Sequence, residues 1–126
     1  MKINKFEDIQ AWQESRILTR KIYELSESNK SFSKDLRFKS QITSCAVSVM
    51  SNIAEGFSRG GNKEFARFLF ISKGSLSELQ SQLYIALDLK YITKKDFDEV
   101  FQLSDKTARL ISKFISYLKN TINAKI

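Results

Sequence analysis

The chain contains no proline, and three of its four glycines, Gly56, Gly60 and Gly61, fall within six residues. Proline and glycine are the residues that most strongly disfavour a helix interior, so helix can continue over most of this sequence without interruption. Glycine also ends helices, because it adopts left-handed backbone angles without a steric penalty. The sequence therefore predicts an all-α fold in which a glycine corner, within residues 51–83, separates two long helices.

Apolar and small residues recur at alternating steps of four and three along four segments, approximately residues 6–28, 33–57, 62–91 and 94–122. This spacing places them on one face of a helix. Short connections between long helices favour antiparallel neighbours, so we expect an antiparallel up-down-up-down four-helix bundle that forms a single domain over residues 1–126. The residues expected to face the core are Ala11, Ser15, Leu18, Ile22 and Leu25; Phe38, Ile42, Ala46, Val49, Ile53 and Phe57; Phe65, Leu69, Ser72, Leu76, Leu79, Leu83 and Ala86; and Phe97, Phe101, Ser104, Ala108, Ile111, Ile115, Leu118 and Ile122.

Each connection offers a residue that can cap the helix after it. Ser33, followed by an acidic residue in the next turn, is predicted to begin the second helix, and Asn62 is predicted to cap the third. Thr93 with Asp96 resembles a capping box, with aspartate in place of glutamate, and marks the start of the fourth helix.

The third helix is apolar on every side near its start. At about 100° per residue, Phe68, Phe70 and Ile71 surround this helix together with Phe65 and Leu69. In a monomeric bundle each helix keeps one face in water, so the excess apolar surface predicts a second interface, formed by self-association.

The composition limits the available chemistry, because the 126 residues include no histidine and a single cysteine. Histidine is the commonest general base near neutral pH and a ligand in the Glu-x-x-His pattern of di-iron bundles. One cysteine excludes an intramolecular disulfide and every CxxC motif. Cys45 lies among apolar neighbours and is expected to be buried, with a reactive thiol as the alternative. We expect no catalytic residue, no metal site and no cofactor.

The N-terminal residues lack the apolar segment of a signal peptide, and no stretch approaches the roughly 18 consecutive apolar residues of a membrane span. We therefore expect a cytoplasmic protein without a membrane partner. Its net charge of +7 favours anionic partners, among them nucleic acid and acidic proteins.

The segment from Asn52 to Gly56 places the side chains of Asn52 and Glu55 on one helical face. A carboxylate near the C-terminal end of a helix is opposed by the helix dipole, so we expect Arg59 or Arg67 to compensate Glu55. The resulting ion pair would fix the corner or a subunit contact, and a ligand site is the alternative.

Gly74 lies inside the third helix, where glycine costs roughly 1 kcal/mol relative to alanine. With Ser75 beside it and Glu78 one turn further on, Gly74 is expected to mark the close approach of another helix backbone. A notch that contacts an anion is the alternative. Trp12 is in register with the apolar stripe of the first helix and is expected to anchor packing.

Arginine and lysine side chains gather loosely in the first helix and around the corner. Arginine forks suit phosphate oxygens, and neutralising several phosphates would make binding strongly salt dependent. The sequence has no aromatic-interleaved motif for RNA recognition, so an ordinary solvated surface is the alternative. The candidate nucleic-acid contacts are Arg16 and Arg20, with Lys21 beside them, and Arg59, Lys63, Arg67 and Lys73.

Five segments carry a resemblance that covers nearly the whole chain. They are FEDIQAW near the start, IYEL at 22–25, SNIAEGFSRG at 51–60, EFARFLFISKGSLSELQSQL at 64–83 and ALDLKYI at 86–92. The combination of NIAEG with EFxxFLxIxxGSxxE is specific. By these residues the chain resembles the four helix bundle family of proteins encoded in 23S rRNA intervening sequences, some of which are labelled S23 ribosomal proteins although they are not established ribosome components.

That family is similar to the accessory variability determinant protein of diversity-generating retroelements, a homopentameric barrel with a basic surface that binds nucleic acid and its reverse transcriptase. The resemblance therefore implies pentameric assembly and nucleic-acid binding. This sequence departs from the family's pattern early in the second helix. The family usually has two adjacent arginines or similarly polar residues there, whereas this chain has Thr43-Ser44, so the resemblance gives less support for a basic face on that helix. The residues expected to serve the structural motif or a subunit interface are Asn52, Glu55, Gly56, Phe65, Phe68, Phe70, Gly74 and Glu78.

The leading hypothesis is a non-enzymatic homo-oligomer, pentameric by resemblance, that binds RNA or other nucleic acid through phosphate contacts without strong sequence reading. The alternative is a protein-interaction or scaffold module, in which the basic residues serve only solubility. A hydrolase or nuclease is a third class, and it would need a metal ion held by carboxylates such as those of Glu55, Glu64 and Glu78.

Overall fold

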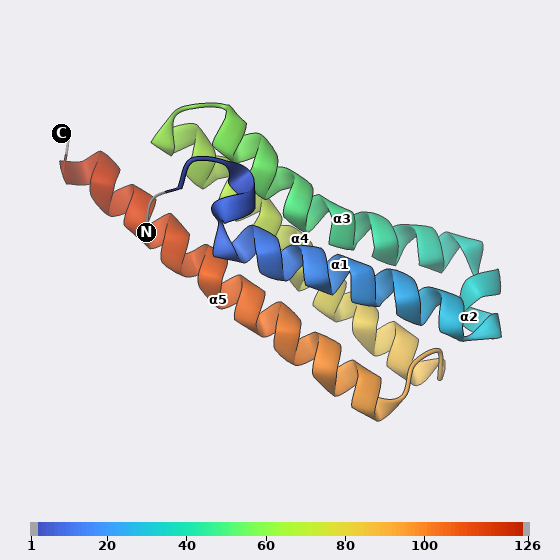
Figure 1. Cartoon of the computed structure of the whole chain (residues 1–126). Helices are drawn as coiled ribbons and strands as arrows, with labels where there is room; N and C mark the ends of the chain where they lie inside the picture. Colours follow the sequence, from blue (N-terminus) through green and yellow to red (C-terminus); the bar gives the residue numbers. More distant parts are fainter. Residues whose placement is uncertain (1–2, 125–126) are drawn as a thin grey trace.

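The computed structural model describes residues 3–124 of the chain, with side chains up to residue 121. Its elements in chain order are a short 3-10 helix, η1 (Phe6–Asp8), and five α-helices, α1 (Gln10–Ser28), α2 (Lys30–Lys34), α3 (Leu36–Ser58), α4 (Asn62–Asp88) and α5 (Lys94–Ala124) (Figure 1). The described residues contain no strand. The predicted all-α class is confirmed.

The four long helices form an antiparallel bundle in which α1 packs against α3 and α5, and α4 packs against the same two helices. Helices α1 and α4 are therefore diagonally opposite one another. Each long helix runs antiparallel to the next, which confirms the predicted up-down-up-down arrangement. The connection between α3 and α4, the N-terminal segment and the C-terminal part of α5 gather at one end of the bundle, which we call the corner end (Figure 1).

Two helix starts differ from the prediction. The first predicted helix begins as η1, and its α-helical part starts only at Gln10. The second predicted helix is divided into α2 and α3, whose N-caps are Asn29 and Asp35 in place of Ser33. The Asn29 Oδ1 accepts the backbone N–H of Phe32 at 2.9 Å, and the Asp35 Oδ1 caps α3 in the same way. The Ser33 prediction was wrong because these two side chains each cap a separate turn.

The corner and the last connection show two further differences. Asn62 is the first residue of α4, and its expected capping position is taken by the extended backbone of Gly61. Helix α4 ends at Asp88, earlier than predicted, because Lys90 adopts a left-handed backbone conformation with φ of 61°. The predicted cap of the final helix is confirmed, since Thr93 Oγ1 accepts the backbone N–H of Asp96 at 3.1 Å.

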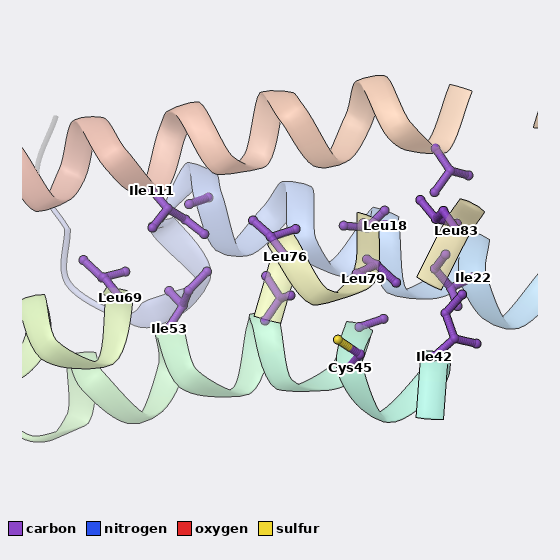
Figure 2. Close-up of a cluster of buried hydrophobic side chains, with 14 of the residues drawn as sticks. Leu18, Ile22, Ile42, Cys45, Ile53, Leu69, Leu76, Leu79, Leu83 and Ile111 are labelled. Carbon is purple, nitrogen blue, oxygen red and sulfur yellow. The ribbon is translucent and has the colours of Figure 1, made fainter. Parts of the chain in front are cut away.

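The core forms where the predicted stripes of the four long helices meet (Figure 2). Leu18 and Ile22 of α1, and Ile53 of α3, are each at most 1% exposed. The predicted stripe of α4 is buried throughout, whereas Leu25, Phe57, Phe101 and Ala108 lie at the edge of the core. The Ile122 side chain lies outside the described residues. Buried hydroxyls in the stripes bind backbone carbonyls, as Ser72 Oγ does by donating to Val49 O at 2.6 Å.

Candidate nucleic-acid interface

At the corner end, the chain turns from α3 into α4 at Gly60 and Gly61. Gly60 has a φ of 85°, a left-handed angle that glycine adopts freely. Directly before it, the guanidinium of Arg59 lies 3.7 Å from the Glu55 carboxylate, with both side chains about half exposed. The predicted compensation of Glu55 is therefore confirmed for Arg59. Arg67 instead pairs with Glu64.

Two arginines lie against the same aromatic ring in the corner. The Cζ atoms of Arg59 and Arg67 are 5.3 and 4.7 Å from the centroid of Phe68, whose side chain is 8% exposed. Arg67 also donates two hydrogen bonds to Glu64, at 2.8 and 3.3 Å. This hydrogen bonding lowers the pKa of Glu64 and raises the pKa of Arg67. Stacking and pairing together hold both guanidiniums in place.

Gly56 is the glycine at which two helices come close. A Cβ at this position would lie 2.6 Å from the Cβ of Phe68 and 3.0 Å from the ring of Phe65. Gly74, by contrast, is exposed, and a Cβ there would meet no atom within 4 Å. Within this chain the expected close approach at Gly74 is therefore wrong, because the backbone crossing lies two turns nearer the corner, at Gly56.

A polar groove of about 390 Å³ runs between the middle parts of α3 and α4. The Asn52 amide donates to Ser48, and the hydroxyl of Ser48 lies 2.9 Å from that of Ser75. The Cys45 thiol donates to the backbone carbonyl of Ser75. Glu78 also lines this groove. The motif residues Ser75 and Glu78 thus line one groove, and Asn52 is joined to it through Ser48.

Cys45 is buried, as expected, with only 7% of the residue exposed. Burial and, to a smaller extent, the charge of Glu78 raise the pKa of this thiol to about 11. A thiol with such a pKa is almost entirely protonated at neutral pH, which favours the structural interpretation over a reactive nucleophile.

The structure separates the predicted nucleic-acid contacts into two groups. Arg16 and Arg20 lie exposed on α1, where Arg16 stacks on Trp12 and Arg20 pairs with Glu24. The other predicted contacts are at the corner or on α4, the helix diagonally opposite α1. The first group is therefore not continuous with Lys73, which is exposed on α4. Lys63, also exposed, lies between the two stacked arginines in sequence and beside the corner.

The sequence interpretation missed a third group of cations on α5. Lys106, Arg109 and Lys113 are all exposed and follow one another at steps of three and four, so they share one side of the helix. Lys106 bridges to Glu14 of α1 at 3.0 Å. Arg109 and Lys113 form no ion pair with any described side chain. The same periodicity that revealed the apolar stripe would have revealed this basic one.

Large apolar side chains remain exposed along the outward side of α4. Phe70, Ile71, Tyr84 and Ile85 are 42–51% exposed. Phe65 and Phe68, in contrast, are covered by this chain itself. The apolar excess predicted for the start of α4 is therefore partly absorbed by the corner and partly left on the surface. The Lys119 ammonium of α5 lies 4.8 Å from the ring centroid of Phe70, so this lysine shields part of the ring.

The described residues hold no group of three cysteine or acidic side chains placed to bind a metal ion. None of the helices in residues 3–124 combines the length and the hydropathy that crossing a membrane requires.

Comparison with known proteins bears on this arrangement in two ways. A solved structure from Bacteroides thetaiotaomicron VPI-5482, a protein with unknown function from the S23 ribosomal protein family, matches this fold with a TM-score of 0.77. The match covers 83% of this chain and 97% of that one at 20% sequence identity, a level that shows the fold alone. No curated protein matches the sequence. The model of the 23S rRNA-intervening sequence protein family matches residues 7–113, so this chain belongs to that family.

Proposed function

We propose that this protein is a non-enzymatic, homo-oligomeric bundle that binds RNA or other nucleic acid through phosphate contacts at the corner end. The proposal rests chiefly on one observation, the unequal distribution of charge along the bundle. Phosphate contacts supply most of the affinity in nucleic-acid binding that does not depend on sequence, so the position of the excess positive charge indicates the binding surface.

Hydrogen bonds between helices show which residues lie at the same level of the bundle. Thr19 donates to Ala46 O and Cys45 donates to Ser75 O, which sets the level on α1, α3 and α4. On α5 the level falls near Asp105 and Lys106, because Lys106 reaches Glu14 on the corner side of this level and Asp105 accepts from Gln80 on its distal side. A plane through these levels divides the described chain into a corner half, residues 3–18, 47–75 and 106–121, and a distal half, residues 19–46 and 76–105. Ten cations and five carboxylates lie in the corner half, a net charge of +5, whereas nine of each lie in the distal half, which is neutral.

Self-association is supported by the exposed apolar side of α4. Its members include Ile71 and Ile85, four turns apart on one side of the helix, with Gly74 between them. Exposed apolar residues in such a row are typical of an interface between proteins. A second copy of the chain packed on α4 would leave the cations of α5 and the corner available to nucleic acid. Subunit number is taken as five, the state implied by the family resemblance.

Binding of a labelled single-stranded RNA should be measured across a salt series. We expect Lys63→Glu with Arg109→Glu to weaken binding strongly and to flatten the slope of log affinity against log salt by about 1.4, at about 0.7 per phosphate contact of a single strand. The matched control is Lys30→Glu with Lys95→Glu in the distal half. Both pairs change the net charge equally, and the control places its glutamates at helix starts, where the helix dipole favours them.

Equal weakening by the two pairs would show that only net charge matters and would contradict the corner assignment. Wild-type protein that does not bind at low salt, or whose binding is independent of salt, would refute nucleic-acid binding itself. A partner captured equally well after nuclease treatment would then favour the scaffold function. Light scattering tests assembly separately, and Ile71→Glu with Ile85→Glu should reduce the mass to that of one chain.

A further inference from the structure

A cleft of about 760 Å³ opens at the corner end, between the N-terminal segment, the last turn of α3 and the C-terminal part of α5. Three other cavities of the described chain measure about 450, 390 and 250 Å³. The volume of the corner cleft lies within the range of about 300–1,000 Å³ that is typical of sites for small organic groups. All of its lining residues belong to the corner half, which carries the excess positive charge.

The walls of this cleft are aromatic and aliphatic. Phe57, Leu110, Phe114 and Leu118 line the interior. Tyr117 lines it too and is 64% exposed, so its ring projects from α5 into solvent. Phe114 contacts Tyr117 edge to face, with centroids 6.0 Å apart and an angle of 90° between the rings. One aromatic ring therefore supports a second, whose exposed face can receive a planar group by stacking.

Polar groups surround the apolar walls. The side-chain amides of Gln10 and Asn62 line the cleft, and neither makes a hydrogen bond with another described residue. An amide offers both donors and an acceptor, the combination that reads the edge of a nucleobase. Asp8 also lines the cleft, with one carboxylate oxygen bound to the backbone N–H groups of Asn4 and Lys5. Its negative charge disfavours a phosphate on that side.

The cation that lines the cleft is Lys113, which belongs to α5, whereas Asp8 belongs to η1. Lys113 lies one turn before Tyr117 on α5 and one turn after Arg109, so the unpaired cations of α5 lead directly to the cleft. This arrangement matches the two parts of a nucleotide. The aromatic ring and the unpartnered amides suit its planar base, and the row of cations suits its charged backbone. A wholly apolar partner would leave Lys113, Gln10 and Asn62 without compensation for their lost hydration.

We infer that this cleft binds one unstacked base of a single-stranded nucleic acid, which stacks on Tyr117 while Lys113 contacts an adjacent phosphate. The inference rests on the proposed function and adds the strand type and the contact to it. A paired base cannot enter, because both of its faces are covered by neighbouring bases and its edge is hydrogen-bonded to the other strand. The cleft therefore selects single strands over duplexes, without reading an extended sequence.

Binding of one labelled single-stranded RNA should be compared between the wild-type protein and three variants. Tyr117→Ala should weaken binding about 5- to 100-fold with little change in salt slope, because base stacking carries no counterion release. Tyr117→Phe keeps the ring and should bind like wild type. The matched control is Tyr23→Ala, which removes a 45% exposed tyrosine from α1 in the distal half and should have no effect. The same RNA as a duplex should bind Tyr117→Ala and wild type equally.

A 4-thiouridine strand, crosslinked by light, should attach to the α5 peptide that carries Tyr117. Wild-type binding that Tyr117→Ala leaves unchanged would overturn the cleft site and leave the proposed function intact. Absent wild-type binding would instead refute the proposed function. If Tyr117→Ala reduces the mass of the assembly in light scattering, the cleft is covered by a second copy of the chain and the inference is wrong. Equal loss of duplex and single-strand binding would also overturn it.

Discussion

The packing of α3 on α4 predicts opposite effects for the same substitution at two glycines. In Gly56→Ala the added methyl would lie 2.6 Å from the Cβ of Phe68, against the 3.4 Å at which ordinary contact begins, so about 0.8 Å must be opened. That Cβ is fixed to the backbone of α4, so a change of rotamer cannot open the gap and the helix itself must move. Overpacking of this kind costs about 1–3 kcal/mol.

Alanine also favours helix by about 1 kcal/mol relative to glycine. The overpacking cost should be near the upper end of its range. After the gain in helix preference is subtracted, Gly56→Ala should lower the free energy of unfolding by about 1–2 kcal/mol. At about 4 °C per kcal/mol for a chain of this size, Tm should fall by about 4–8 °C. Gly74→Ala is the matched control, because its methyl meets open space and only the helix preference remains. That variant should gain about 1 kcal/mol.

Urea unfolding followed by circular dichroism would measure both variants, with equal m-values confirming that the unfolded states are comparable. Several protein concentrations are needed, because association with a second copy would make the stability depend on concentration. Gly56→Ala as stable as wild type would refute the reasoning, since it would mean that α4 can withdraw at no cost. A loss of stability in Gly74→Ala that grows with protein concentration would show that a second copy packs closely on that position.

Other contacts make equally specific predictions. At pH 8 about one Cys45 thiol in a thousand is ionised, because its pKa of about 11 lies three units higher, so iodoacetamide followed by mass spectrometry should alkylate native Cys45 about 100-fold more slowly than a free thiol. Alkylation at the rate of a free thiol would contradict the burial. Asp35→Ala removes the cap of α3 and the acceptor of the Tyr91 hydroxyl, 2.7 Å away, and should cost about 1–2 kcal/mol in urea unfolding, whereas Asp35→Asn should restore much of the cap. Ser72→Ala leaves the Val49 carbonyl without its buried donor and should cost about 1–2 kcal/mol by the same measurement; an unchanged midpoint would show that the carbonyl finds another partner.

The core of the bundle could be predicted because helical periodicity depends only on the order of residues along the chain. The division of the second helix could not, because it depends on a tertiary contact. Phe32, which stands in a polar connection, is 1% exposed and packs on Phe38 and Tyr91. Burying that ring requires α2, and Asn29 then caps α2 in place of a helix start at Ser33.

The candidate functional surfaces were harder to predict for a similar reason. Periodicity shows which residues share one side of a helix, but it does not show which helices are neighbours. Arg16 and Lys73 could therefore not be separated before α1 and α4 were known to be diagonal. The two glycines within helices could not be distinguished either, because only the crossing of α3 and α4 determines that Gly56 is covered and Gly74 is open. The basic row that includes Lys113, in contrast, could have been predicted from the periodicity of the α5 sequence.

The charge difference between the two halves of the bundle also has a kinetic consequence. A neutral distal half and a corner half of +5 give the molecule a permanent electric dipole along the bundle axis, with its positive pole at the corner end. In the field of an approaching polyanion this dipole exerts a torque that turns the molecule before any contact is made. Collisions then occur preferentially through the corner end, so added salt should slow association much more than it speeds dissociation. The opposite pole, formed by α2 and the turn between α4 and α5, would point away from the bound strand.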